Sequence, residues 1–395
     1  MSERDHLRLP LLSAGFRLFF LLSAVWACVG IPLWLAVYGG AAQLQTALPP
    51  SAWHAHEMVF GFAAATVAGF MLTAIPNWTG RMPVQGLPLA LLGLAWFAGR
   101  VGVLFSADIG ASAACVLDLL FPIAFLAVVA RELIAGRNWR NLPMLTALVF
   151  LLLGNLLVHL EALGLADTAA FGNQFGIATL LMLISFVGGR IIPSFTRNWL
   201  AKRRPDMRPP VPFGWFDQAV MVLTAVALVA WLFLPDAIVT SGLCLAAGLA
   251  QWARLVRWRG LATLPEPLLW VLHLGYGWLG LGFCLLGWNG LPPFVALHAL
   301  TVGAIGTMTL AVMTRATLGH TGRPLIAGPG TTTIYVLVTT AALCRLAAPF
   351  VGSHYLLMLS IAGSAWSAAF GLFALLYLRP FVQPRIPRGV EVRPI

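Results

Sequence analysis

Apolar runs of about 20 residues recur along the whole chain, and short polar segments separate them. A run of this length crosses the roughly 30 Å of hydrocarbon in a bilayer as an α-helix. The runs lack the period-two alternation that strands of a membrane barrel require. The pattern therefore predicts an all-α integral membrane protein with about twelve transmembrane helices. The expected spans are residues 16–38, 54–76, 86–105, 110–132, 142–162, 170–192, 216–234, 237–257, 267–287, 293–315, 331–351 and 355–379.

The composition agrees with this prediction. Hydrophobic residues make up 60% of the chain and charged residues 9%, whereas about a quarter of an ordinary soluble domain is charged. A soluble globule, a disordered chain and a coiled coil are excluded. We expect residues 1–395 to form a single polytopic domain in contact with the lipid bilayer, and the longest loop, 198–214, to act as a linker.

The cations fall in alternate loops. Lys and Arg lie before the first span and after the even-numbered spans, while the loops on the other side carry Asp108, Asp167 and Asp236. Because positive loops stay in the cytoplasm, both termini are predicted to be cytoplasmic. The net charge of +11 thus indicates orientation in a membrane and not a nucleic-acid partner.

Two arginines depart from this pattern. Arg100 lies at the outer end of the third span, and Arg345 lies in the outer third of the eleventh. A charge at such a depth is costly unless it reaches the interface or finds a partner. Either these side chains snorkel or form a local ion pair, for which Asp118 is a candidate, or they bind an anionic ligand near the outer face.

The second and tenth spans repeat one another. His56 and His298 are each followed after five residues by a glycine, Gly61 or Gly303, and after 23 residues by Thr-Gly-Arg. The sixth span carries a fainter copy without the histidine. This repetition predicts that the twelve helices form three arcs of four.

The outer end of the second span holds two histidines. Residues two apart on a helix point in nearly opposite directions, so His54 and His56 cannot readily bind one metal ion together. His56 shares a face with Phe60 and is the inward candidate, and Trp53 could pack on a macrocycle bound there.

His298 lies at a similar depth in the tenth span. Two imidazoles on different helices, without a carboxylate or thiolate at metal-ligand spacing, favour an axial pair on haem iron. Arg100 and Arg345 would then bind the haem propionates. The alternative is that His56 and His298 are ordinary core histidines and the arginines are unrelated.

Three further histidines are candidates for a second metal. His159, near the outer end of the fifth span, is either a further ligand or an interfacial residue. His273 and His320 lie toward the other side and could form a site with Met308 or Met313, which would suit copper. The five cysteines form no CxxCH sequence, so the expected haem is of the b type.

The chain resembles the NnrS family of bacterial integral-membrane proteins over nearly its whole length. The strings that carry the resemblance are Gly15-Phe16-Arg17-Leu18-Phe19-Phe20, Trp53-His54-Ala55-His56-Glu57, Ala74-Ile75-Pro76-Asn77-Trp78-Thr79-Gly80-Arg81, Gly189-Arg190-Ile191-Ile192-Pro193 and residues 311–324. The resemblance implies a twelve-helix haem and copper protein of the bacterial inner membrane, associated with denitrification and with tolerance of nitric oxide and nitrosative stress. It implies nitric oxide or another diatomic gas as ligand, and it fixes neither the electron donor nor a catalysed reaction.

A more distant likeness connects the chain with the catalytic subunit of haem-copper oxidases. His56 and His298 are similar to haem ligands on helices 2 and 10 there, but Ala296 replaces a second helix 10 histidine, and the sixth and seventh spans contain no histidine. The leading hypothesis is therefore a haem-binding redox or sensing protein. A nitric oxide or oxygen reductase with an atypical centre, using His273 and His320, and a twelve-helix transporter remain alternatives.

Overall fold

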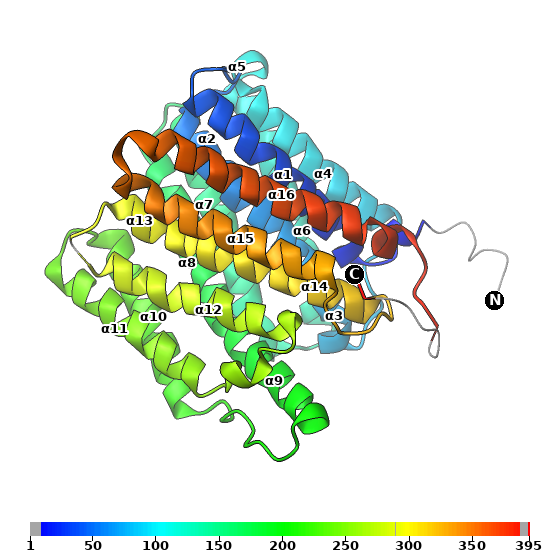
Figure 1. Ribbon diagram of the computed structural model, residues 1–395. Coiled ribbons are helices and arrows are strands. Elements are labelled where there is room, and N and C mark those ends of the chain that lie inside the picture. The colour runs from blue at the N-terminus through cyan, green and yellow to red at the C-terminus, as the bar shows by residue number, and fades with distance from the viewer. Residues whose placement is uncertain (1–8, 289, 388–393) are drawn as a thin grey trace. The chain divides into compact units, whose positions relative to one another are not determined.

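The computed structural model describes residues 9–288, 290–387 and 394–395, and the regular elements among them are all helical (Figure 1). The first eight α-helices are α1 (Gly15–Tyr38), α2 (Pro50–His56), α3 (Ala64–Thr79), α4 (Leu87–Leu104), α5 (Ser106–Ile109), α6 (Ala111–Ala135), α7 (Leu142–Ala162) and α8 (Ala169–Leu183). The others are α9 (Gly189–Arg203), α10 (Trp215–Phe233), α11 (Ile238–Val256), α12 (Pro267–Leu286), α13 (Pro293–His298), α14 (Thr307–His320), α15 (Pro329–Ala347) and α16 (Tyr355–Val382).

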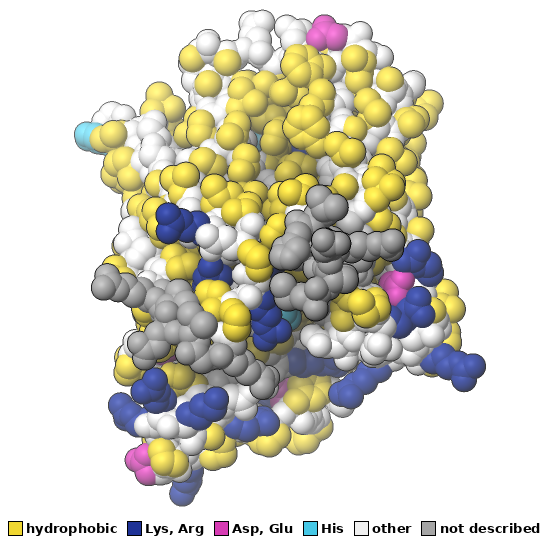
Figure 2. All heavy atoms as spheres, turned by 90° about the vertical axis from the view of Figure 1, so that its right-hand side faces the viewer, with side chains coloured by type: hydrophobic (Ala, Val, Ile, Leu, Met, Phe, Trp, Pro, Cys, Tyr) yellow, Lys and Arg dark blue, Asp and Glu magenta, His cyan; other side chains and the backbone are white. Residues whose placement is uncertain are grey.

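Twelve helical stretches within the described residues are long and apolar enough to cross a membrane, which confirms the predicted fold class. Most of their ends lie within a few residues of the predicted ones. The largest difference is in the sixth span, which runs from Ala169 to Arg203, well beyond the predicted end at residue 192. Broad areas of exposed hydrophobic side chains, which a lipid-facing surface requires, are visible in Figure 2.

The local sequence explains where many helices begin and end. Proline stands in the first turn of several helices, where its missing N–H costs no hydrogen bond. Gly80 ends α3 with a φ of 69°, the left-handed conformation that glycine adopts most readily. The side chain of Glu266 accepts a hydrogen bond of 3.1 Å from the N–H of Leu268 and so caps α12.

The chain divides into two compact units. The first comprises Met1–Thr179, Ala316–Arg323 and Phe370–Val392. Within it, α1 packs on α3, α4 packs on α6, and α6 packs on α7. Arg17 is buried in this unit, and its guanidinium donates to the carbonyl oxygens of Pro380 and Phe381, both at 2.8 Å, and of Gln383, at 2.6 Å. It thereby satisfies carbonyls at the end of α16 that have no partner within the helix.

The second unit comprises Leu180–Arg315, Pro324–Ala369 and Arg393–Ile395. Here α10 packs on α11, and α11 packs on α12, side by side in Figure 1. A buried ion pair joins α10 to α11, because Arg254 Nε donates to Asp217 Oδ1 at 2.8 Å. Arg254 also donates to the hydroxyl of Tyr276 at 2.8 Å, and that hydroxyl donates to Gln251 Oε1 at 2.6 Å.

In the described part of the chain, three of the spans contain a π-helical segment. These segments are Glu57–Ala63, Ile184–Gly188 and Ala299–Gly306, and they lie in the second, sixth and tenth spans. They are the spans in which the sequence repeats itself. His56 and His298 each stand immediately before a π-helical segment, so the sequence repeat is matched by a repeat of backbone geometry. The arrangement in three arcs and the single domain stay predictions.

Candidate functional site

A group of six polar side chains lies buried in the first unit, and each is at most 2% exposed. They come from the second, third, fourth and fifth spans. We call this group the buried polar cluster; its members are His56, Glu57, Arg100, Asp118, Asn155 and His159.

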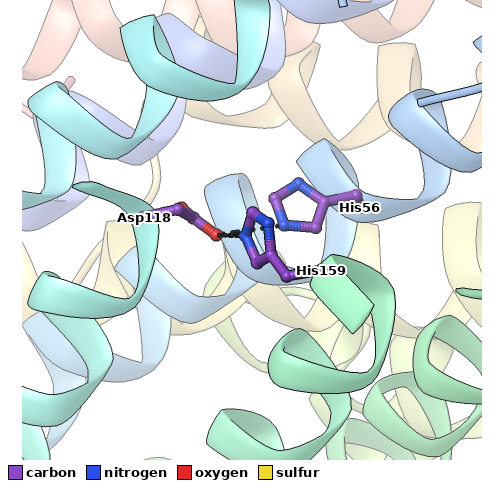
Figure 3. Close-up of side chains that lie close together, drawn as sticks. All are labelled: His56, Asp118 and His159. Carbon is purple, nitrogen blue, oxygen red and sulfur yellow. Dashed lines mark hydrogen bonds and ion pairs between the residues drawn. The ribbon is translucent and has the colours of Figure 1, made fainter. Parts of the chain in front are cut away.

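Three members have the geometry of a metal centre. One ligand atom from each of His56, Asp118 and His159 lies within 4.8 Å of the other two. Oδ2 of Asp118 is 3.1 Å from His56 Nε2 and 2.9 Å from His159 Nε2. Figure 3 shows both imidazoles directed at this carboxylate. Ligand atoms about 2.1 Å from one metal ion are separated by roughly 3.0–3.5 Å, so a small closure around an ion would complete the site.

His56 is surrounded by hydrogen-bond acceptors. Its Nδ1 is 3.0 Å from Glu57 Oε1, and its Nε2 is 2.8 Å from Asn155 Oδ1 in addition to its contact with Asp118. The amide of Asn155 is oriented by its own bond, since Nδ2 donates to Asp118 Oδ2 at 2.8 Å. A neutral imidazole, which donates from one nitrogen only, cannot satisfy these contacts.

The charges of the cluster also favour an added positive charge. Arg100 donates to Glu57 Oε2 at 2.7 Å and to Asp118 Oδ1. Two carboxylates and one guanidinium leave one negative charge if both imidazoles are neutral. Because an uncompensated charge is costly among apolar helices, the cluster favours one more positive charge, either a proton on His56 or a metal ion.

The backbone around Gly61 allows these spans to approach closely. A Cβ at this position would lie 2.7 Å from Arg100 Nη1 and 2.9 Å from Glu57 Oε2. The carbonyl oxygen of Gly61 also accepts a bond of 3.0 Å from Trp96 Nε1. The glycine five residues after His56 therefore makes room for the guanidinium that balances the cluster.

The structure brings His56, Arg100 and His159 together and gives Arg100 the ion pair with Asp118 that the sequence left open as one interpretation. His54 points elsewhere and stacks on Trp34, with ring centroids 4.7 Å apart. The role of His54 and Trp53 beside a cofactor stays a prediction. Trp53 is buried in the same turn, at 1% exposure.

His298 and Arg345 lie in the second unit. His298 Nδ1 donates to the carbonyl oxygen of Phe294 at 2.6 Å. The guanidinium of Arg345 lies over the ring of Phe294, 5.5 Å from its centroid. Because His56 belongs to the first unit, an axial pair with His298 stays a prediction.

The pair expected to bind copper is likewise divided between the units. His273, in the second unit, has Nδ1 3.1 Å from the carbonyl oxygen of Leu269 and Nε2 3.4 Å from the hydroxyl of Thr196. His320, in the first unit, packs against Phe16, with ring centroids 5.6 Å apart. Their role as a copper site also stays a prediction.

The residue that sequence reasoning underrated is Asp118. The sequence names it only as a candidate ion-pair partner of an arginine, yet Asp118 contacts four members of the cluster. The sequence does carry one signal, since a carboxylate within a membrane span is a functional candidate by default, but the partners of Asp118 were not predictable from it. Asn155 gave no comparable signal, because a single amide in an apolar helix has many structural uses.

A family model described as NnrS protein matches residues 10–385, nearly the whole chain. No curated protein matches the sequence.

Proposed function

We propose, from the premise that the chain belongs to the NnrS family, that it is a membrane protein of the nitric oxide response with a redox-active metal ion in the buried polar cluster. Family membership suggests the nitric oxide response, and the cluster supports the metal. We further propose that the protein lies in the bacterial inner membrane with both termini in the cytoplasm, because the cations occupy the loops on that side.

The observation that carries this proposal is the set of three ligand atoms from His56, Asp118 and His159. Two imidazoles and one carboxylate form the facial set typical of non-haem iron(II), and imidazole also suits copper. A set of three protein ligands leaves coordination positions open for a small molecule such as nitric oxide. A redox-active ion bound there would supply gas binding and electron transfer.

The other members of the cluster hold the ligands in place. The carboxylate of Glu57 fixes His56 by a bond to Nδ1, which leaves Nε2 for the ion. Arg100 holds both carboxylates and offsets part of their charge. Because every member is buried, bulk solvent does not reach the ligands, and a small uncharged gas could reach them through the apolar core more easily than an ion.

The haem predicted from the sequence is a second candidate, and His298 is the residue that favours it. Its Nδ1 is bonded to a backbone carbonyl, so Nε2 carries the lone pair that a metal needs, and no described residue bonds to Nε2. Trp278 packs on Gly303, and its buried Nε1 has no partner among the described residues. His56 fits haem less well, because its Nε2 faces Asp118 and Asn155 within the cluster. Haem b with copper is thus the alternative centre.

Purified full-length protein distinguishes the two centres. We would measure iron and copper content and record reduced-minus-oxidised spectra for the wild type and for His159→Ala, His298→Ala and His56→Ala. For a metal ion in the cluster, His159→Ala and His56→Ala should each lower the metal content by about tenfold or more, and His298→Ala should leave it unchanged.

The results of these measurements distinguish a metal ion in the cluster from the haem alternative. Loss of a haem spectrum in His298→Ala with full pigment in His159→Ala would move the centre to the haem alternative. Equal metal content in the wild type and in His159→Ala would overturn the proposal. The nitric oxide role is tested by adding nitric oxide to the reduced protein, which should change the optical or paramagnetic signal of the wild type and not that of His159→Ala.

A further inference from the structure

The sixth span is longer than a bilayer is thick. It comprises 35 residues, Ala169–Arg203, and at 1.5 Å per residue it is roughly 50 Å long. The hydrocarbon layer accounts for about 30 Å of this length. Because the cations of this span lie in α9, Gly189–Arg203, the end of α9 is the part that projects beyond the hydrocarbon.

Exposed cations gather on this end of the second unit. They are Arg190, Arg197, Lys202, Arg203, Arg204, Arg208 and Arg259. Asp206 is the one exposed carboxylate among described residues 184–214 and 256–266. No carboxylate partner of Lys202, Arg203, Arg204 or Arg208 occurs in the described part of the chain.

The basic segment is folded onto its unit. The N–H of Val211 donates to the carbonyl oxygen of Arg257 at 3.2 Å. The ring of Phe213 lies under Arg190 and Arg254, each 5.9 Å from its centroid. Cations that only set the orientation of the chain in the membrane would not need these contacts. The contacts therefore give this surface a defined structure.

Exposed apolar side chains border the cations. Trp215, at the start of α10, is 79% exposed, and Leu261 and Leu264, in the turn before α12, are 85% and 61% exposed. Tryptophan at the end of a span is typical of the membrane interface. Cations beside these exposed apolar side chains match the two parts of a phospholipid, an anionic headgroup and acyl chains. An acidic soluble protein would match the cations alone.

We propose that this surface, formed by α9, the loop 204–214 and the turn 257–264, binds an anionic phospholipid of the leaflet from which α9 projects. The headgroup phosphate contacts the arginines and Lys202, and the acyl chains lie against Trp215 and Leu261. Clusters of cations next to a span are the usual recognition element for such lipids. The proposal is independent of the metal centre.

The experiment uses full-length protein that has been delipidated and returned to nanodiscs or micelles. Native mass spectrometry measures retained phosphatidylglycerol against phosphatidylcholine for the wild type and for Arg203→Gln/Arg204→Gln. The expected result is a loss of affinity for phosphatidylglycerol of roughly tenfold or more in the variant. A melting curve checks that the variant is folded, which we expect because both substituted positions are exposed.

The matched control removes two exposed arginines from the first unit. Arg137→Gln/Arg140→Gln should retain phosphatidylglycerol as the wild type does. Equal retention by all three proteins, or equal loss in both variants, would overturn the proposal. Displacement of the lipid by millimolar inorganic phosphate would assign the site to free phosphate instead. Tight binding of an acidic protein with no preference for phosphatidylglycerol would assign the surface to a protein partner.

Discussion

At the scale of single residues, Asp118 is the side chain on which the buried polar cluster depends. One of its oxygens faces both imidazoles and the amide of Asn155, and the other accepts from Arg100. With this number of partners, the carboxylate can stay ionised away from water. Arg100 and His56 in turn rely on it for charge compensation, so removing it would affect the whole cluster.

Asp118→Asn is expected to lower the metal content by about tenfold or more, since it removes one ligand and the negative charge. It should also destabilise the protein by about 3–5 kcal/mol, because Arg100 loses one partner of a buried ion pair. The control is Asp217→Asn, which breaks the buried pair with Arg254 in the second unit. Metal analysis and thermal unfolding of both proteins check this, and metal loss in both would refute a specific role for Asp118.

Gly61→Ala tests the close approach at the cluster. The added Cβ would meet the Arg100 guanidinium at 2.7 Å, so the guanidinium must move away from Glu57 or Asp118, and metal content should fall. Gly303→Ala is the matched change in the second unit, where the Cβ would meet Trp278 at the same distance. It should lower stability and leave the metal in place. Retention of the full metal content by Gly61→Ala would contradict this account.

At the scale of helices, the π-helical segments decide where the candidate ligands point. A π-helical turn contains more residues than an α-helical turn and is frequent at functional sites. His56 and His298 stand at the junctions between α2 or α13 and such a segment. The direction of each imidazole relative to the rest of its span therefore depends on the length of the π-helical segment.

Deleting Val59 should shorten the segment Glu57–Ala63 toward an α-helix and turn His56 by about 100° relative to α3. Metal should be lost while the protein still inserts into the membrane, because the span stays long enough. Deleting Phe186 from Ile184–Gly188 is the control and should leave the metal in place. Metal analysis of membrane-extracted protein measures both, and retention after the Val59 deletion would show that the π-helical segment does not position His56.

At the scale of the whole chain, the first unit combines early segments with late ones. Arg17 illustrates how they are held together, since its guanidinium reaches three carbonyls in residues 380–383. Bonds to a charged donor contribute more than neutral ones. This buried contact is therefore a stability element of the fold and lies outside the candidate site.

Arg17→Gln is expected to lower the free energy of unfolding by about 3 kcal/mol, because carbonyls at the end of α16 lose their donor. Arg81→Gln, which removes a half-exposed ion pair with Glu132, should cost at most about 1 kcal/mol. Denaturation in detergent compares the two proteins. A similar small loss in both would show that the Arg17 contacts contribute little, and the metal content should be unchanged in either variant.

The twelve spans were predictable from the sequence, because hydrocarbon thickness dictates the length of each apolar run. The inward direction of His56 followed from its spacing to Phe60, and the two rings do pack, with centroids 5.3 Å apart. The central place of Asp118 was not predictable. Which helices face each other depends on packing between spans far apart in sequence, and periodicity within one span does not report it. The π-helical segments were also not predictable, since no residue type indicates them.

All six side chains of the buried polar cluster lie between residues 56 and 159, in four consecutive spans. During synthesis these spans leave the ribosome after the first span, Gly15–Tyr38, and before all the later ones. Carboxylates entering a membrane singly are costly to insert, but here each can meet its arginine or histidine as soon as the fifth span arrives. The cluster thus offers an early assembly point for biogenesis, at which charge pairing holds the first helices together while the later ones are still being made.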